Sequence, residues 1–527
     1  MKNKIFIPIL AASILILGSC TGNQKPGLEE RADNISKTEM QAVAEFLGDD
    51  LLEGRAPGTR GGNLTELYMK SLCKFLDLEP GFKGSYEQPF ELIGFTSSDI
   101  LLEAEGRKLE YIEDFVGTFT MEEQKPVVSG EAVFVGFGIT AGNWDWDDYK
   151  DADVEDKIVV TRVNDPGSVH PDIFEGSTLT YYGRWTYHIE EAARRGAAGI
   201  LLIHTDESAG YDWNVVRNSW TGEELYIQSE LQNNMKFRGW VKEAALKRLL
   251  LEKGIDLDDL MHHSEQKDFE PVNLDLEIKL EGKNESRKII NKNILAEIPG
   301  KSKERIVLSA HLDHLGMDPD KTGDNIYNGA IDNGTAVAAM MVSAKILKEY
   351  QEDLWYSVTI LGCQAEESGL LGSKYYMQNT EREEIIANIN FESTPVWEKS
   401  GSIMGIGARF SDFEDLIKDL AGDEGLNYST FSRSNQGLFY RSDQFSFARY
   451  GIPAVWISAG EDEISGVRNY TDFWSTDYHT VKDEFNEDWP LESMRQTIKY
   501  ALLLIHEINS TKIPPKWKSD LSFPTEE

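Results

Sequence analysis

The second half of the chain alternates short apolar runs with longer amphipathic ones, and this alternation restricts the fold more than any other feature. The apolar runs have the length of strands and include "RIVLSAH", "YSVTILGCQA", "IIANINFE" and "IPAVWISAG". Helical patterns such as "NGTAVAAMMVSAKILKEY" and "LESMRQTIKYALLLIHEI" separate or follow them. Because strands this apolar are buried on both faces, the sequence predicts an α/β fold with a mostly parallel, twisted sheet and helices on both faces.

A chain of 527 residues is also long enough for more than one domain. Between about residues 98 and 275, short β-rich runs such as "EAVFVGFGI" and "DKIVVTRV" alternate with clusters of Gly and Asp. This texture predicts a β-rich α+β domain inserted into the first one. The first domain is then built from residues 38–97 and 276–512, and residues 513–527 form a C-terminal tail.

The N-terminus predicts export. Residues 1–19 carry Lys2 and Lys4 and then an apolar stretch, which is typical of a secretory signal and short of the roughly 20 apolar residues of a membrane span. The residues ending at Cys20 resemble the lipobox of bacterial lipoproteins, which implies a lipid on Cys20 and a location in the bacterial envelope. Residues 20–37 are expected to be a linker outside the fold. The alternative is a signal cleaved nearby, with Cys20 incidental.

Charge and cysteine content exclude two classes of protein. The excess of 90 Asp and Glu over 53 Lys and Arg gives a net charge of -37, which repels phosphate backbones, so we expect no nucleic-acid partner. Membrane contact is expected only through the lipid anchor. After Cys20 only Cys73 and Cys363 remain, too few for a disulfide framework. We expect both to be buried thiols.

Side chains suited to metal binding recur where the predicted strands end. In open α/β sheets ligands gather at the carboxyl ends of the strands. The side chains at these positions and in the last loop are His311, Asp313, Asp332, Glu366, Glu367, Glu392 and His479. Two imidazoles and three carboxylates suit a pair of zinc ions, with one further glutamate left as a base.

The order of these motifs, HxD, GAxDNG, EExGLLGS, N-x-acid and YHTxxD, resembles the co-catalytic zinc aminopeptidases, the exopeptidase family that also contains glutamate carboxypeptidase and glutaminyl cyclase. The resemblance covers roughly residues 38–95 and 285–510. The insert resembles a protease-associated domain in "VFVGFGI", "DKIVV" and "EAARRGAAGILL".

The resemblance implies a ligand set for two zinc ions. His311 and Glu392 would bind one ion, Glu367 and His479 the other, and Asp332 would bridge them. It also implies that Asp313 orients His311, that Glu366 takes a proton from the water between the ions, and that the peptide bond between Asp332 and Asn333 is cis.

Two positions depart from the family pattern. Glu392 stands where the family usually has aspartate, and Gln444 replaces the histidine of a Ser-Asp-His stretch. We therefore expect Asp443 and Gln444 to be packing groups or groups behind the ligands. His314 is expected to be a loop histidine rather than a third ligand.

The function implied is that of a zinc-dependent exopeptidase, an aminopeptidase that removes N-terminal residues from peptides through a hydroxide bridging two zinc ions. A carboxypeptidase of the same family and an inactive binding protein on this scaffold, as in the transferrin receptor, remain alternatives. A glutaminyl cyclase is less favoured, because those enzymes hold one zinc and lack the histidine that His311 provides. The side-chain preference and the oligomeric state stay open.

Overall fold

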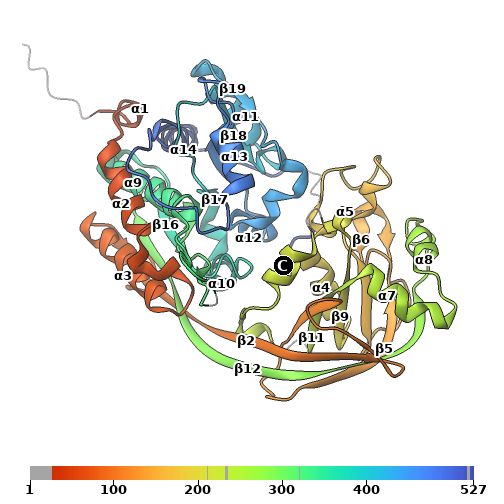
Figure 1. Ribbon diagram of the computed structural model, residues 1–527. Coiled ribbons are helices and arrows are strands. Elements are labelled where there is room, and N and C mark those ends of the chain that lie inside the picture. The colour runs from red at the N-terminus through yellow and green to blue at the C-terminus, as the bar shows by residue number, and fades with distance from the viewer. Residues whose placement is uncertain (1–25, 210–211, 232–234, 320, 519–522, 527) are drawn as a thin grey trace, which may run out of the picture.

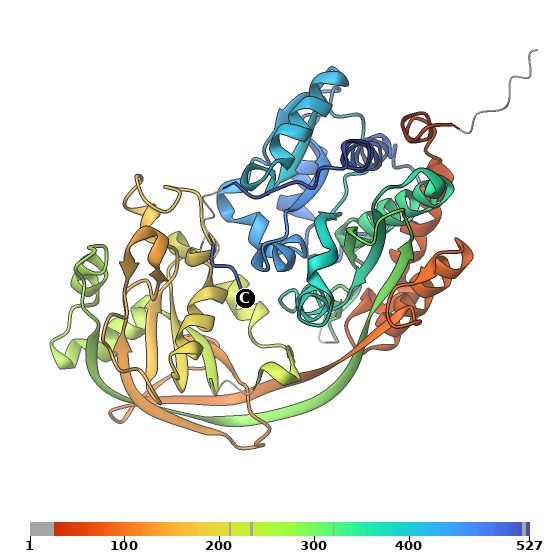
Figure 2. The same ribbon diagram turned by 180° about the vertical axis from the view of Figure 1, so that it is seen from behind.

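The computed structural model describes residues 26–209, 212–231, 235–319, 321–518 and 523–526. Within these residues, two lobes share a continuous 16-stranded sheet. A long curved ribbon of two antiparallel strands, β2 (Glu87–Ala104) and β12 (Val272–Ile298), runs beneath both lobes (Figures 1 and 2). The domain boundaries expected near residues 98 and 276 fall inside these two strands. The lobes are therefore joined by a hydrogen-bonded ribbon rather than by loops.

The larger lobe contains the predicted α/β sheet, with strands in the order β19–β18–β20–β17–β13–β16–β12. The central pairs β20–β17, β17–β13 and β13–β16 are parallel, whereas β18 and β12 run antiparallel to β20 and β16. The strands other than β12 are β13 (Arg305–His311), β16 (Ser357–Cys363), β17 (Ile385–Asn390), β18 (Ser402–Ile406), β19 (Asn427–Ser429) and β20 (Ala454–Ala459).

Helices cover both faces of this sheet, as the sequence predicted. The helices of this lobe are α1 (Leu28–Ala32), α2 (Lys37–Leu47), α3 (Arg60–Phe75), α9 (Ala336–Glu349), α10 (Leu371–Gln378), α11 (Phe413–Asp423), α12 (Gln444–Arg449), α13 (Asn469–Thr476) and α14 (Glu492–Thr511). Along β13, Ile306 and Leu308 pack with residues of α2, α9 and α14, while Val307 packs with residues of α10 and α12. This alternation is the reason that the strand reads as continuously apolar.

The smaller lobe is the predicted insert. Its strands β5, β8, β9 and β11 run parallel, and β4 closes the edge antiparallel to β11. The strands and helices are β3 (Arg107–Leu109), β4 (Phe115–Phe119), β5 (Val127–Phe134), β8 (Ile158–Arg162), β9 (Gly199–His204), β10 (Glu224–Ile227), β11 (Phe237–Lys242), α4 (Trp185–Arg194), α5 (Asp206–Ala209), α6 (Trp213–Ser219), α7 (Glu243–Leu250) and α8 (Leu257–His263). Two-residue strands within the insert are β6 (Thr140–Ala141) and β7 (Trp146–Asp147). Those outside the insert are β1 (Glu79–Pro80), β14 (Gly316–Met317) and β15 (Ile326–Tyr327).

The lobes also meet away from the ribbon, and the C-terminal segment takes part in the contact. The ring of Tyr181 in the insert lies 4.6 Å from the ring of Phe445, and Glu190 of α4 pairs with Arg449. Phe523 is 3% exposed and packs on the same aromatic cluster. Part of the predicted tail is therefore a buried element of the fold.

The expectation that residues 20–37 lie outside the fold is wrong for the described part of that segment. Leu28 and Ala32 in α1 and the following Ile35 are buried against the core of the larger lobe. Leu28 and Ala32 are four residues apart, so they lie on one face of α1, and the polar composition of the segment obscured this face. The signal at residues 1–19 and Cys20 lie outside the described residues. Among those described, no helix combines the length and the apolarity that crossing a membrane requires.

Candidate metal centre

The predicted ligands come together at one edge of the sheet. His311 is the last residue of β13, and the two strands beside β13 are followed by Glu366 and Glu367 (after β16) and by Glu392 (after β17). Asp332 lies in the turn directly before α9, which packs on β13. These strands are parallel, so their carboxyl ends lie at the same edge and bring these side chains together.

The carboxylate of Asp332 lies between two histidine–carboxylate pairs. Its Oδ1 is 3.2 Å from Nε2 of His311, and its Oδ2 is 3.2 Å from Nε2 of His479. The same nitrogen of His311 is 3.3 Å from Oε1 of Glu392, and that of His479 is 3.2 Å from Oε2 of Glu367. The pairing agrees with the two ligand sets that the resemblance implied, although the ligand roles themselves stay predictions.

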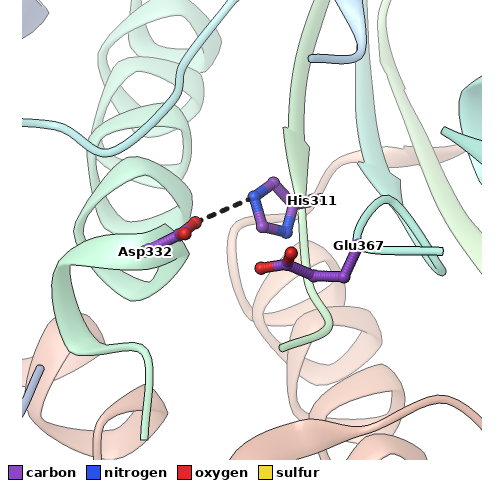
Figure 3. A group of neighbouring side chains, drawn as sticks. All are labelled: His311, Asp332 and Glu367. Atoms are coloured by element: carbon purple, nitrogen blue, oxygen red, sulfur yellow. Dashed lines mark ion pairs between the residues drawn. The ribbon is translucent and has the colours of Figure 1, made fainter. Parts of the chain in front are cut away.

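The side chains lie close enough together for several of them to bind the same cation. Figure 3 shows His311, Asp332 and Glu367 turned toward one another, and one donor atom from each lies within 4.8 Å of the others. The same limit holds for a second group of His311, Glu366 and Glu392. Asp332 Oδ1 and His479 Nε2 are buried, and their 3.2 Å ion-pair contacts do not have the geometry of hydrogen bonds. Bound cations would satisfy both atoms, so the donor set fits a metal centre.

Burial and crowded carboxylates dominate the electrostatics. Burial opposes protonation of His311, yet the carboxylates of Glu392 and Glu366 raise its pKa well above the usual value. Burial acts on His479 in the same direction, and Glu367 and Asp332 raise its pKa to about 10. Burial would raise the pKa of Asp332, but the two imidazoles lower it well below its usual range. The protein thus gathers negative charge that divalent cations would balance.

Glu366 differs from its neighbour Glu367. Burial raises the pKa of Glu366 well above the usual carboxyl value, and the nearby carboxylates of Glu392 and Glu367 add to the effect although His311 opposes it. Its Oε2 lies 3.9 Å from Nε2 of His311, farther than the atoms of the two pairs. A carboxyl group that holds a proton readily and faces the centre is suited to proton transfer.

Asp313 contacts His311, the residue that it was expected to orient, and it also supports the two glutamates after β16. The Nδ1 atom of His311 lies 3.2 Å from the main-chain carbonyl of Asp313 and 3.9 Å from its carboxylate. The carboxylate itself accepts the N–H groups of Glu366 and Glu367 at 3.1 and 3.3 Å. The main chain of Asp313 is therefore the closer partner of His311, and its side chain fixes the turn that presents the two glutamates.

Two further side chains support the ligands. Asp483 accepts the N–H groups of Ile331 and Asp332 at 2.8 and 2.9 Å, which holds the turn that carries Asp332. His314, expected to be a loop histidine, is 1% exposed and its Nδ1 lies 2.8 Å from Oε1 of Glu367. Two features of the sequence pointed to these supporting residues: Asp483 is the final Asp of the YHTxxD motif, and His314 lies three residues after His311.

A buried polar chain leads to Glu392. The amide of Asn390 donates to Ser442 Oγ at 2.8 Å, and Ser442 Oγ donates to Oε2 of Glu392 at 2.6 Å. The same amide donates to Oε1 of Gln444 at 2.8 Å, so Gln444 lies behind the ligands, and Asp443 beside it is buried. Ser442 thus holds the side chain of Glu392, which is longer than the aspartate that the family usually has at this position.

The family model for Peptidase family M28 matches residues 293–504. This segment belongs to peptidase family M28. All seven predicted site residues lie within it, and the peptide bond between Asp332 and Asn333 is cis, as the resemblance implied. The match to the family model confirms the resemblance to the co-catalytic zinc aminopeptidases for the M28 segment.

Individual relatives agree with this assignment. Leucine aminopeptidase 1 of Ajellomyces capsulatus (strain NAm1 / WU24) is 25% identical over 240 residues, which cover 41% of this chain and 56% of the relative. Aminopeptidase YwaD of Bacillus subtilis (strain 168) is 24% identical over 215 residues, which cover 40% of this chain and 42% of the relative. The matches thus span about half of the length of these curated relatives.

The aminopeptidase from Aneurinibacillus sp. strain AM-1 has a similar fold across both lobes. Its solved structure aligns with a TM-score of 0.52 at 16% identity and covers 95% of this chain and 100% of its own. The M28 segment and the insert are thus arranged as parts of one known architecture.

Proposed function

We propose that this protein is a zinc-dependent exopeptidase, and specifically an aminopeptidase that removes N-terminal residues from peptides. The observation that carries the proposal is the position of Asp332, whose two oxygens each lie 3.2 Å from a different histidine. Imidazole and carboxylate donors are ordinary zinc ligands, and a carboxylate shared between two sites is typical of co-catalytic metal centres.

The residues would divide between two ions. His311 and Glu392 would hold the first, Glu367 and His479 the second, and Asp332 would contribute one oxygen to each. When bound, the two ions supply positive charge that activates a water molecule and polarises the carbonyl of the scissile peptide bond.

Glu366 would move the proton. Its buried carboxyl group faces the centre and its pKa is raised well above the ordinary value, mainly by burial. Glu366 accepts a proton from the attacking water and then donates it to the amine of the leaving peptide, so that one residue serves as base and acid. Asp313 keeps Glu366 in place by binding its main-chain N–H.

The names of the relatives favour an aminopeptidase over a carboxypeptidase. The test is a panel of aminoacyl chromogenic amides, each with a free and a blocked N-terminus, compared with peptides that differ only at the C-terminus. Hydrolysis that requires a free N-terminus supports the proposal. Cleavage of blocked peptides from the C-terminus would identify a carboxypeptidase instead.

Zinc content separates an enzyme from an inactive binding protein. The purified full chain is expected to hold about two zinc ions, and removal of the metal by a chelator should abolish hydrolysis until zinc is restored. A protein that binds no zinc and hydrolyses none of the peptides would contradict the proposal.

The cellular context is inferred from the sequence. We place the enzyme in the bacterial envelope, attached through a lipid on Cys20, with peptides as its substrates and no nucleic-acid partner. Replacement of Cys20 by alanine should release the protein from membrane fractions, and continued membrane association would contradict the anchor.

A further inference from the structure

The segment "GRAPGTRGG", which follows α2 and runs into the start of α3, contains a buried arginine close to the metal centre although it lies outside the M28 segment. Arg55 is 1% exposed, and its main chain has a φ of 55°, in the left-handed region. Burying an arginine in this manner is costly unless its donors are satisfied. The contacts of its guanidinium group therefore indicate what the residue does.

The guanidinium of Arg55 binds four main-chain carbonyls from three separate segments. Its Nε donates to the carbonyl of Leu312 at 3.0 Å, and its Nη2 donates to the carbonyl of Gly329 at 3.0 Å. Its Nη1 donates to the carbonyls of Leu47 and Asn328. One planar group thus ties the end of α2 to two loops that are distant in the sequence.

Both loops carry metal ligands. Leu312 directly follows His311, and Gly329 lies three residues before Asp332. The side chains of His311 and Asp332 approach each other to 3.2 Å at the centre. A group that fixes the carbonyls of both loops fixes the spacing between these two side chains.

The packing around Arg55 leaves little room for adjustment. A Cβ on Gly54, which precedes it with a φ of 65°, would lie 2.3 Å from the carbonyl oxygen of Gly316 and 2.6 Å from that of Tyr327. A Cβ on Gly329 would lie 2.1 Å from the carbonyl oxygen of Asp332. Glycine is required at both places because main-chain groups approach each other so closely.

The charge of Arg55 is also matched to the site. The carboxylates of Asp483, Asp332 and Asp313 all interact with the guanidinium electrostatically. A permanent positive charge close to this many carboxylates offsets part of their mutual repulsion.

We propose that Arg55 is a positioning residue of the metal centre, which holds the His311 and Asp332 loops at the separation needed for both side chains to bind one ion. This inference rests on the proposed zinc site. Arg55 touches neither the ions nor the substrate; it acts through the main chain of the two loops.

The test compares zinc binding by the full chain and three variants. Arg55→Lys keeps the charge but loses the planar fork, and Arg55→Gln loses the charge but keeps an amide donor. Arg60→Gln is the matched control, since Arg60 is a nearby arginine at the start of α3, has a side chain that is 71% exposed and pairs with Glu53. Zinc dissociation constants are measured by competition with a chromophoric chelator, and the cobalt-substituted proteins are compared by visible absorption.

We expect Arg55→Lys and Arg55→Gln to weaken zinc binding by about 10- to 100-fold, the range for residues that orient metal ligands. Both should also shift the cobalt absorption bands, because the ligand geometry changes. Arg60→Gln should leave the affinity and the bands unchanged. Circular dichroism and thermal unfolding of the metal-free proteins show whether the variants are folded.

Three outcomes would overturn the inference, and they differ from one another. Folded Arg55→Lys with unaltered zinc affinity and cobalt bands would show that the contacts do not position the ligands. Failure of both Arg55 variants to fold, with and without zinc, would show that the residue serves the fold as a whole. A wild-type chain that binds no zinc would remove the proposed function and this inference together.

Discussion

The hydroxyl of Ser442 gives the sharpest test of how this chain accommodates glutamate as a metal ligand. Ser442 Oγ donates to Oε2 of Glu392 at 2.6 Å, and both side chains are buried. The other oxygen of Glu392, Oε1, faces His311. Ser393 also donates to Oε1, at 3.2 Å, so it does not replace the contact that Ser442 makes.

We predict that Ser442→Ala weakens binding of one zinc ion by about 10- to 150-fold. A hydrogen bond to a charged group contributes about 1.5–3 kcal/mol, and each 1.4 kcal/mol corresponds to a factor of about ten in affinity. The substitution also leaves the amide of Asn390 without one of its acceptors, which adds to the loss. The result should be a looser Glu392 and a lower affinity at the ion that it shares with His311.

The assay is a zinc titration of the metal-free protein against a chromophoric chelator. Ser446→Ala is the matched control, because Ser446 is also buried and in the same region, but its hydroxyl contacts Ser373 rather than a predicted ligand. We expect the control to bind both ions as the wild type does. Equal zinc affinity in Ser442→Ala and wild type would refute the argument that this hydroxyl fixes Glu392.

Three further predictions concern other parts of the chain. Glu366→Gln should retain zinc while kcat falls by a factor of about 100 to 10,000, the usual contribution of a general base, and a variant that retains wild-type kcat would exclude the role. Burial raises the pKa of Asp148 to about 7 from an ordinary value near 3.8, so the stability that depends on its protonated form is present at acidic pH and is lost as the pH rises through 7. The melting temperature of Asp148→Asn relative to wild type should therefore increase from pH 5 to pH 8. A difference that stays constant over this range would contradict the prediction. Phe523→Ala should lower the free energy of unfolding by about 3–5 kcal/mol, whereas Phe75→Ala, at a position 85% exposed, should change it little; equal effects would show that the C-terminal segment is not part of the core.

The sequence predicted the larger lobe well because its signals are local. The parallel strands β13 and β16 are short apolar runs; His311 is the last residue of β13, and Glu366 and Glu367 follow β16 closely. Burial of both Cys73 and Cys363, expected from their apolar surroundings, is confirmed. The five predicted ligands all lie in the sequence motifs, and the structure brings their side chains together.

The residues behind the ligands were harder to identify. Asp483, Ser442 and Arg55 act on loops that are far from them in the sequence, and a serine or arginine in a polar stretch has no pattern that reveals its partner. The helix α1 was missed for a related reason, since five residues with two apolar side chains are too few for a periodic signal. The boundaries predicted near residues 98 and 276 fall inside strands because composition does not show that β2 and β12 continue through them.

Local patterns in the chain are enough to give the class of fold and the kinds of donor atom at the strand ends, because apolar periodicity and motif spacing act over a few residues. That one oxygen of Asp332 faces His311 while the other faces His479 becomes apparent only in the folded structure. The folded structure also decides which carbonyls the guanidinium of Arg55 binds. Such contacts depend on how whole strands and helices pack, since the residues that meet are brought together by the sheet and not by their neighbours in the chain.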